Sequence, residues 1–270
     1  MKVDNQTTLY HIGFSRNDIE HATLAILVDD CAYIKDLASS LDSQAKLIII
    51  NREYHSYLIH VGSSPVLLIS TGFGGPAMGI GLEELSMLGF TDFIRIGESG
   101  GVRPSLKIGD FVIAKGALRQ EGTSQHYAPI NYPASADFNF VGFAEQALIA
   151  SGNDYKIGVV ASTDILWPKQ TASDLFDKCS MDYQRKLLKN WHDYRILSVD
   201  NTTATLLTIA NVFNLRAISV LDIVDKIDSP EYELTNIKRN DALRIEKWCR
   251  FLPKLMQSIV SENQGNKPQS

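Results

Sequence analysis

The 270-residue sequence predicts a single α/β domain whose central sheet mixes parallel and antiparallel strands. Short apolar runs rich in β-branched residues alternate with longer amphipathic stretches. Several runs are apolar on both faces, as strands covered by helices on two sides must be. No repeat, low-complexity linker or break in composition divides the chain. We therefore expect one domain over residues 9–262, between a flexible N-terminus at 1–8 and a disordered tail at 263–270.

The apolar runs and the helical periodicity place the individual elements. Strands are predicted at residues 23–28, 47–52, 57–61, 66–71, 92–97, 111–118, 156–161 and 217–224. Helices are predicted at residues 78–88, 203–212 and 241–260. The first helix carries one apolar stripe of Met78, Leu82, Leu85 and Leu88, and the third carries Leu243, Trp248, Leu252, Leu255 and Ile259. Such stripes are typical of core packing rather than of cofactor contacts.

Composition narrows the class of protein. The 26 Lys and Arg residues face 31 Asp and Glu residues, and a formal net charge of −5 disfavours nucleic acid as a partner. The dispersed cysteines Cys31, Cys179 and Cys249 fit neither a disulfide framework nor a CxxC metal site, which favours a reducing compartment. No apolar run approaches the roughly 20 residues that span a bilayer. We expect a cytoplasmic protein with no membrane partner.

Two segments that follow predicted strands have the composition of ligand sites. In Ser70–Pro76, glycines permit a tight turn that can point backbone N–H groups at an anion, although a turn without any ligand fits equally well. This run is neither a dinucleotide fingerprint nor a Walker loop. The other segment is Arg95–Gly101. Arg95 lies in an otherwise apolar strand, so its guanidinium needs either a ligand or a structural carboxylate. Ligands of open α/β sheets bind beyond the carboxyl ends of strands, where both segments fall.

Six motifs occur in the order seen in one enzyme family. They are His11-Ile12-Gly13, Asn51-Arg52-Glu53, STGFGGPAMGIGLEEL, FIRIGESGG, LRQEGTSQHYAP and SVDNTTATLLT. The chain resembles the uridine phosphorylases of the nucleoside phosphorylase-I superfamily over nearly its whole length. The resemblance implies a distorted, barrel-like mixed sheet flanked by helices. It also implies phosphate-dependent cleavage of a pyrimidine nucleoside to base and ribose 1-phosphate, without any metal or organic cofactor.

The resemblance also implies roles for particular residues. Phosphate binding falls to Arg52, Arg95, Gly74 and Ser99, with Arg95 also catalytic. Ribose binding falls to His11, Asn201 and Thr202, and base binding to Ser99, Gly100, Leu166, Gln170 and Ile223. In the family His11 and Arg52 serve a neighbouring subunit's site, so we expect a homodimer or a hexamer built from dimers. Simple alternatives are a turn cap for His11 and an ion pair for Arg52.

Five positions depart from the family pattern. Asp29 replaces a glycine, Tyr33 an arginine and Glu98 a threonine around the expected phosphate. Losing one cation and gaining two carboxylates predicts that binding of a phosphate dianion weakens by roughly several kcal/mol. Thr202 replaces the glutamate that clamps ribose, and Ala172 replaces the arginine that polarises the uracil carbonyl.

Three functions stay open from the sequence. The first is a nucleoside phosphorylase with a remodelled pocket and weak or altered activity. The second is a catalytically inactive family member that acts as a nucleoside-binding or partner subunit. The third is a hydrolytic nucleosidase that uses Asp222 as general acid, with Asp30 or Glu98 as further acid or base candidates. Asp222 aligns with the aspartate that purine-handling relatives use to protonate the leaving base, but it could also cap a loop.

Overall fold

The computed structural model of the chain describes residues 3–165, 178–227 and 241–265. The strands are β1 (Leu24–Val28), β2 (Lys46–Asn51), β3 (Tyr54–Val61), β4 (Ser64–Ser70), β5 (Asp92–Gly101), β6 (Phe111–Gln120), β7 (Ala134–Ser135), β8 (Tyr155–Thr163), β9 (Ser198–Asp200) and β10 (Arg216–Lys226). The α-helices are α1 (Ile34–Leu41), α2 (Gly75–Met87), α3 (Phe138–Ala150), α4 (Lys178–Asp193), α5 (Thr203–Val212) and α6 (Asp241–Gly265). Short 3₁₀ turns are η1 (Arg16–Ile19), η2 (Cys31–Tyr33) and η3 (Thr123–His126).

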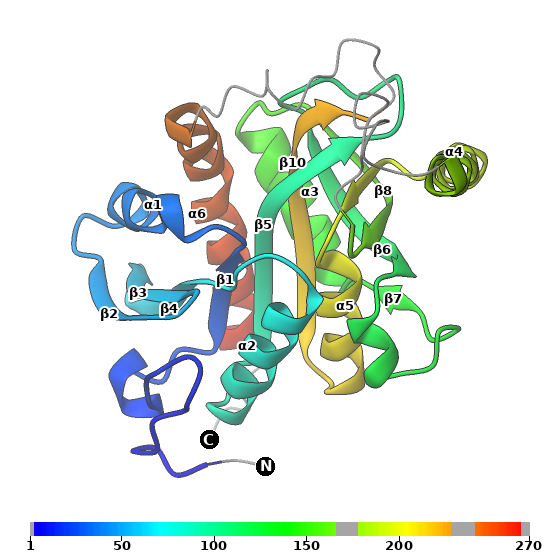
Figure 1. Cartoon of the computed structure of the whole chain (residues 1–270). Coiled ribbons are helices and arrows are strands. Elements are labelled where there is room, and N and C mark those ends of the chain that lie inside the picture. Colours follow the sequence, from blue (N-terminus) through cyan, green and yellow to red (C-terminus); the bar gives the residue numbers. More distant parts are fainter. Residues whose placement is uncertain (1–2, 166–177, 228–240, 266–270) are drawn as a thin grey trace.

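Five strands close into a distorted barrel. Strand β5 pairs in parallel with β10, β10 pairs antiparallel with β6, and β6 pairs in parallel with β8. Strand β8 then pairs in parallel with β9, which returns antiparallel to β5. Outside this ring, β1 joins β5 and is followed by β4, β3 and β2 (Figure 1). The mixed, barrel-like sheet expected from the sequence is confirmed.

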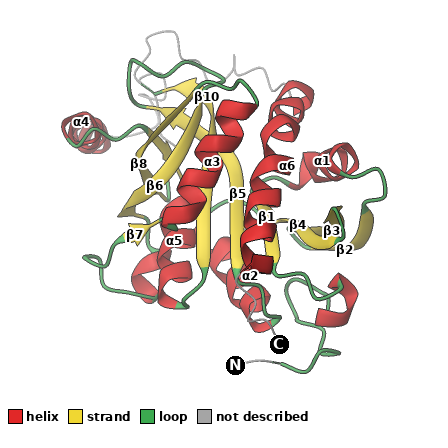
Figure 2. Ribbon diagram, turned by 180° about the vertical axis from the view of Figure 1, so that it is seen from behind, coloured by secondary structure: helices red, strands yellow, loops and turns green. Residues whose placement is uncertain are grey.

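Two apolar cores lie on opposite faces of the sheet. Helices α1, α3 and α6 cover one face and α2 and α5 cover the other (Figure 2). Along β5 the side chains alternate between the cores, since Ile94 and Ile96 join the first and Phe93 the second. Several strands are thus buried on both sides, which is why their sequences are continuously apolar.

The predicted strands coincide with the eight longer strands of the sheet. The short β7 and β9 were not predicted, because two or three residues carry too little pattern, and α1, α3 and α4 were also missed. The predicted stripe of the last helix is wrong at Leu243, which is 51% exposed. Arg244 occupies the buried side in its place and is only 8% exposed.

The described residues extend past both ends of the domain predicted at residues 9–262. Helix α6 runs to Gly265, into the segment predicted as a tail. The side chain of Asn263 donates a 2.7 Å hydrogen bond to Asp92 at the start of β5. Near the N-terminus, the backbone N–H of Asn17 donates to the carbonyl of Asn5 at 3.2 Å, within the segment predicted to be flexible.

Candidate active site

Three neighbouring strands, β1, β5 and β10, run in parallel, and β5 and β10 continue together beyond the end of β1 (Figure 1). The register pairs Val28, the last residue of β1, with Ile96 of β5, so Asp29 follows the end of β1 beside the middle of β5. Glu98 of β5 pairs with Asp222 of β10. The topology therefore gathers charged residues from three distant parts of the sequence at the edge where ligands of α/β sheets bind.

Arg95 lies in a buried cluster with two carboxylates. Its Nε and Nη2 donate to Asp29 at 3.0 and 2.5 Å, and its Nη1 donates to Asp200 at 2.6 Å. The hydroxyl of Thr203 accepts from the same Nη1 at 3.0 Å. The side chains of Arg95 and Asp200 are each 1% exposed and that of Asp29 is 7% exposed. Every guanidinium nitrogen thus has an acceptor within the chain, and the three ionised groups carry a formal charge of −1.

The backbone around this cluster is shaped to hold it. A Cβ at Gly97 would lie 2.6 Å from Oδ2 of Asp29 and 2.8 Å from Nη2 of Arg95, so only glycine leaves room for the pair. Asp200 is fixed from its other side, because Oδ1 accepts a 2.6 Å hydrogen bond from Ser162. Its Oδ2 also accepts from the backbone N–H of the first residue of α5 at 3.0 Å.

Burial and charge act in opposite directions within the cluster. Burial acts to lower the pKa of Arg95, but Asp29 and Asp200 outweigh it and raise that pKa above its ordinary value. Burial raises the pKa of Asp29, and Arg95 opposes this rise. Arg95 is therefore a permanent cation whose charge is already balanced by the protein.

A second ionic cluster surrounds Arg244 of α6. Nη1 of Arg244 lies 2.5 Å from Oε1 of Glu98 and 3.3 Å from Oδ1 of Asp241. Its Nε lies 3.5 Å from Asp222, outside a hydrogen bond, and Nζ of Lys247 lies 4.0 Å from the same carboxylate. The side chain of Arg244 is 9% exposed and that of Glu98 is 34% exposed. Arg244 was not predicted as a site residue. Its contacts with Glu98 and Asp222 place it at the candidate site.

Tyr33 connects the two clusters. Its ring is buried and packs edge to face against Trp248, with 5.3 Å between centroids. Burial raises the pKa of Tyr33, and the nearby charges of Asp29 and Glu98 raise it further, while Arg244 opposes them. The side chain is thus a neutral phenol where the family resemblance expects an arginine.

Asp222 has the environment of a proton donor. Burial raises the pKa of Asp222, and the nearby cations Lys247 and Arg244 act to lower it. Its Oδ1 is buried and accepts no hydrogen bond from the part of the chain that the structure describes. A carboxyl group in such surroundings retains a proton more readily than an exposed aspartate does.

The residues expected to hold ribose lie next to the Arg95 cluster. Thr202 is 1% exposed, and its hydroxyl lies 3.4 Å from Oδ1 of Asp29. The amide of Asn201 donates to the carbonyl of Thr163 at 2.5 Å. Both side chains therefore make contacts within the protein.

The residues expected to contact base continue the same strand ends. Ser99 pairs with Ile223 across β5 and β10, and both are buried. Oγ of Ser99 has no hydrogen-bond partner among the described residues. A Cβ at Gly100 would lie 2.7 Å from the carboxylate of Asp225. Ser99 is thus a buried polar group at the candidate site with spare hydrogen-bonding capacity.

His11 and Arg52 come together at a different place. Nδ1 of His11 lies 2.7 Å from Glu84, whose carboxylate also accepts from the backbone N–H of His11. The amide of Asn51 donates to the carbonyl of His11 at 2.7 Å, and Arg52 donates to the hydroxyl of Tyr10 at 3.2 Å. Within the described residues, His11 and Arg52 share no hydrogen bond or ion pair with the Arg95 cluster. Their roles toward a neighbouring subunit stay predictions.

Of the remaining predicted binding positions, the structure describes Gly74 and not the others. Gly74 precedes α2 with a φ of 90°, a left-handed conformation that favours glycine. Leu166, Gln170 and Ala172 lie outside the described residues.

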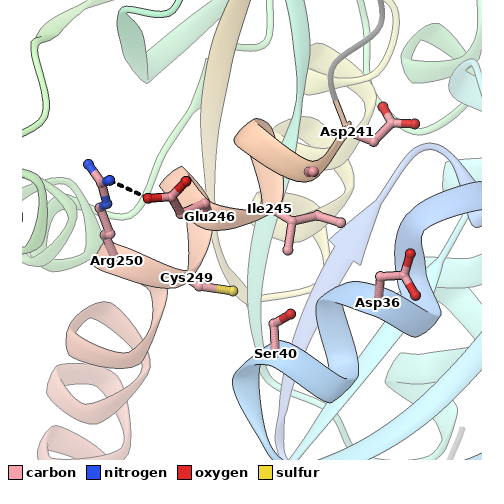
Figure 3. A pocket seen from close by; sticks show the side chains of 8 residues that line it. Asp36, Ser40, Asp241, Ile245, Glu246, Cys249 and Arg250 are labelled. Atoms are coloured by element: carbon pink, nitrogen blue, oxygen red, sulfur yellow. Dashed lines mark hydrogen bonds and ion pairs between the residues drawn. The ribbon is translucent and has the colours of Figure 1, made fainter.

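A surface pocket lies between α1 and the start of α6, next to the Arg244 cluster (Figure 3). Its volume is about 550 Å³, and Asp36, Asp241 and Cys249 are among its lining residues. Asp241 belongs both to this pocket and to the acceptors of Arg244. The pocket thus adjoins the charged strand ends.

Within residues 3–165, 178–227 and 241–265, no three acidic, histidine or cysteine side chains are arranged to hold a metal ion. The helices of the same residues include none that is long and apolar enough to cross a membrane.

Comparison with known proteins identifies the family. Residues 23–256 match the sequence profile of the "Phosphorylase superfamily". The chain belongs to this superfamily. The uridine phosphorylase of Klebsiella aerogenes is 32% identical over 86% of this chain and 90% of the relative, and that of Thermococcus kodakarensis is 36% identical over 77% and 74%. The guanosine phosphorylase of Halorubrum lacusprofundi is 29% identical over 77% of this chain and 79% of the relative.

One site residue of this superfamily member had a usable signal in the sequence. Arg244 falls four residues before Trp248 and eight before Leu252, on the apolar stripe of the last predicted helix. An arginine on a buried helical stripe requires an acidic partner. The sequence does not reveal which carboxylate that is, because Glu98 lies far away along the chain.

Proposed function

We propose that the chain binds a nucleoside at the carboxyl ends of β5 and β10 and cleaves its N-glycosidic bond, as its phosphorylase relatives are named for doing. The supporting observation is the set of buried polar groups at that edge: Asp222, Ser99 and the two arginine clusters. Membership of the phosphorylase superfamily supports the same reaction class. The experiment below determines which base the site prefers, because the relatives are named for both a pyrimidine nucleoside, uridine, and a purine nucleoside, guanosine.

In this proposal Asp222 is the general acid. Cleavage leaves negative charge on the departing base, and a protonated carboxyl group can neutralise it. The raised pKa of Asp222 favours the protonated form. The cleavage rate should then fall as the pH rises through that pKa, because the ionised carboxylate has no proton to give.

We further propose that phosphate is a poor co-substrate of this chain. The three guanidinium nitrogens of Arg95 already donate to Asp29 and Asp200, so a phosphate would have to displace a buried carboxylate. Thr202 offers ribose a neutral hydroxyl, a weaker partner than a carboxylate. Weak or altered phosphorolysis of a pyrimidine nucleoside is the outcome we expect.

The second candidate function is nucleoside binding without catalysis, alone or as the partner of an active subunit. The complete internal pairing of Arg95 favours it, because no cation of that cluster is left for an attacking anion. The third is hydrolysis by water with Asp222 as acid, which needs no anion site.

Release of free base from uridine, thymidine, inosine and methylthioadenosine, with and without phosphate, separates these functions. We expect slow release that phosphate stimulates and that Asp222→Asn lowers by about a hundredfold or more. Asp29→Gly should increase the stimulation by phosphate, with Asp29→Asn as the control that retains side-chain volume. Release that is independent of phosphate would support the hydrolase, and binding of a nucleoside without any release would support the non-catalytic function.

We also propose that the protein assembles as a homodimer or as a hexamer of dimers. Tyr10, whose hydroxyl accepts from Arg52, is 73% accessible and Phe73 is 68% accessible, and exposed aromatic rings of this kind support a contact with another subunit. Sedimentation of the wild type and of Tyr10→Ala, Phe73→Ala tests this, because loss of the two rings should shift the assembly toward monomer.

A further inference from the structure

We propose that Arg244 is a second anion-binding arginine of the site and that Glu98 acts as its internal counter-ion. This proposal rests on the proposed nucleoside-cleaving site and adds to it a residue on α6 that sets the preference between oxyanions and neutral molecules. The ligand class is a tetrahedral oxyanion, such as phosphate or sulfate.

The contacts of Arg244 are those of an anion-binding group that is only partly saturated. Its strongest partner is Glu98, at 2.5 Å. Nε of Arg244 is buried and donates no hydrogen bond to any residue that the structure describes, although Asp222 lies 3.5 Å away. A buried guanidinium N–H without an acceptor is costly, and an oxyanion oxygen would satisfy it.

The position of Arg244 also supports a role in binding an anion. The charge of Arg244 acts to lower the pKa of Tyr33, so the guanidinium lies near that phenol. Helix α6 therefore places a cation beside Tyr33, the position at which the resemblance expects an arginine. The cation near this position is thus supplied by α6, and not by the segment after β1.

Glu98 is the partner that an incoming anion would replace. Its side chain is 34% exposed, whereas that of Arg244 is 9% exposed, so Glu98 can turn toward solvent while Arg244 stays. The other acids that face Arg244 are Asp222 and Asp241, and Lys247 adds a cation beside Asp222. Asp241 is 36% exposed as well, but its 3.3 Å contact is longer than the 2.5 Å contact of Glu98, which is therefore the main counter-ion.

The test measures binding rather than turnover. Calorimetric titration with inorganic phosphate, and separately with sulfate, is carried out on the wild type, Glu98→Gln, Arg244→Met and the double variant. We expect Glu98→Gln to bind phosphate about tenfold more tightly than the wild type, since one repulsive charge near the anion is removed. The double variant should lose this gain.

The matched control is Glu246→Gln, which removes a carboxylate of α6 that pairs with Arg250 on the surface and should leave anion affinity unchanged. If Glu98→Gln is not folded by circular dichroism, Glu98→Thr takes its place. No gain on neutralising Glu98, or a gain that survives Arg244→Met, overturns the proposal. Either result is independent of whether the wild type cleaves nucleosides, because the titration contains no nucleoside.

Discussion

At the residue scale, Arg95 is held by carboxylates that belong to the chain itself. Asp29 and Asp200 lie 66 and 105 positions away in the sequence, and both approach the guanidinium within hydrogen-bonding distance. A buried ion pair of this kind adds little net stability compared with apolar packing, yet removing one partner is costly. The cluster is therefore stable as a whole and sensitive to loss of any single charge.

Asp29→Asn should lower the free energy of unfolding by about 3 kcal/mol, because it leaves the buried Arg95 with one carboxylate instead of two. Urea denaturation followed by circular dichroism measures the change. Glu246→Gln breaks an exposed pair and should cost less than about 0.5 kcal/mol. Equal losses in the two variants would mean that the Asp29 pair is no more important than a surface ion pair.

At the element scale, β5 contributes one residue to each of the two arginine clusters. Arg95 and Glu98 lie on the same strand, and Gly97 between them leaves the space that Asp29 occupies. Helix α6 completes the second cluster with Arg244. The site therefore depends on how closely β1 and α6 approach β5.

Gly97→Ala should destabilise the protein by about 1–3 kcal/mol, because the new methyl group would overlap the carboxylate of Asp29 and push the pair apart. Thermal unfolding measures the effect. The control is Gly142→Ala on the exposed side of α3, where nothing lies within 4 Å of the added Cβ. Alanine there should stabilise the helix by about 0.5–1 kcal/mol. A Gly97→Ala variant as stable as the control would contradict the tight fit.

At the scale of the whole molecule, the closed ring of strands and the two helical layers hold the strand ends in place. Helix α6 lies along one face of the sheet and contributes Trp248, Phe251 and Leu252 to its core, all fully buried. The same packing orients Arg244 toward β5 and β10. Stability of the core and geometry of the site are therefore coupled through α6.

Phe251→Ala should cost about 3–5 kcal/mol of unfolding free energy, since the ring is fully buried and packs against Phe111 with 5.2 Å between centroids. Leu243→Ala, on the exposed side of α6, should cost less than about 0.5 kcal/mol. Chemical denaturation of both variants checks the orientation of the helix. A large loss at Leu243 would restore the apolar stripe first expected from the sequence.

The sequence by itself determined the positions of the longer strands, because burial on two faces requires continuous apolar runs. It also determined the family, through motifs spread along the chain, and it showed that Arg95 needed a partner. Tertiary structure decided which partner that is. It placed Asp29 and Asp200 on Arg95, and it brought Arg244 to Glu98, since strand register and helix packing join residues that no local pattern links. An ion pair depends on distance in space, and the sequence records only distance along the chain.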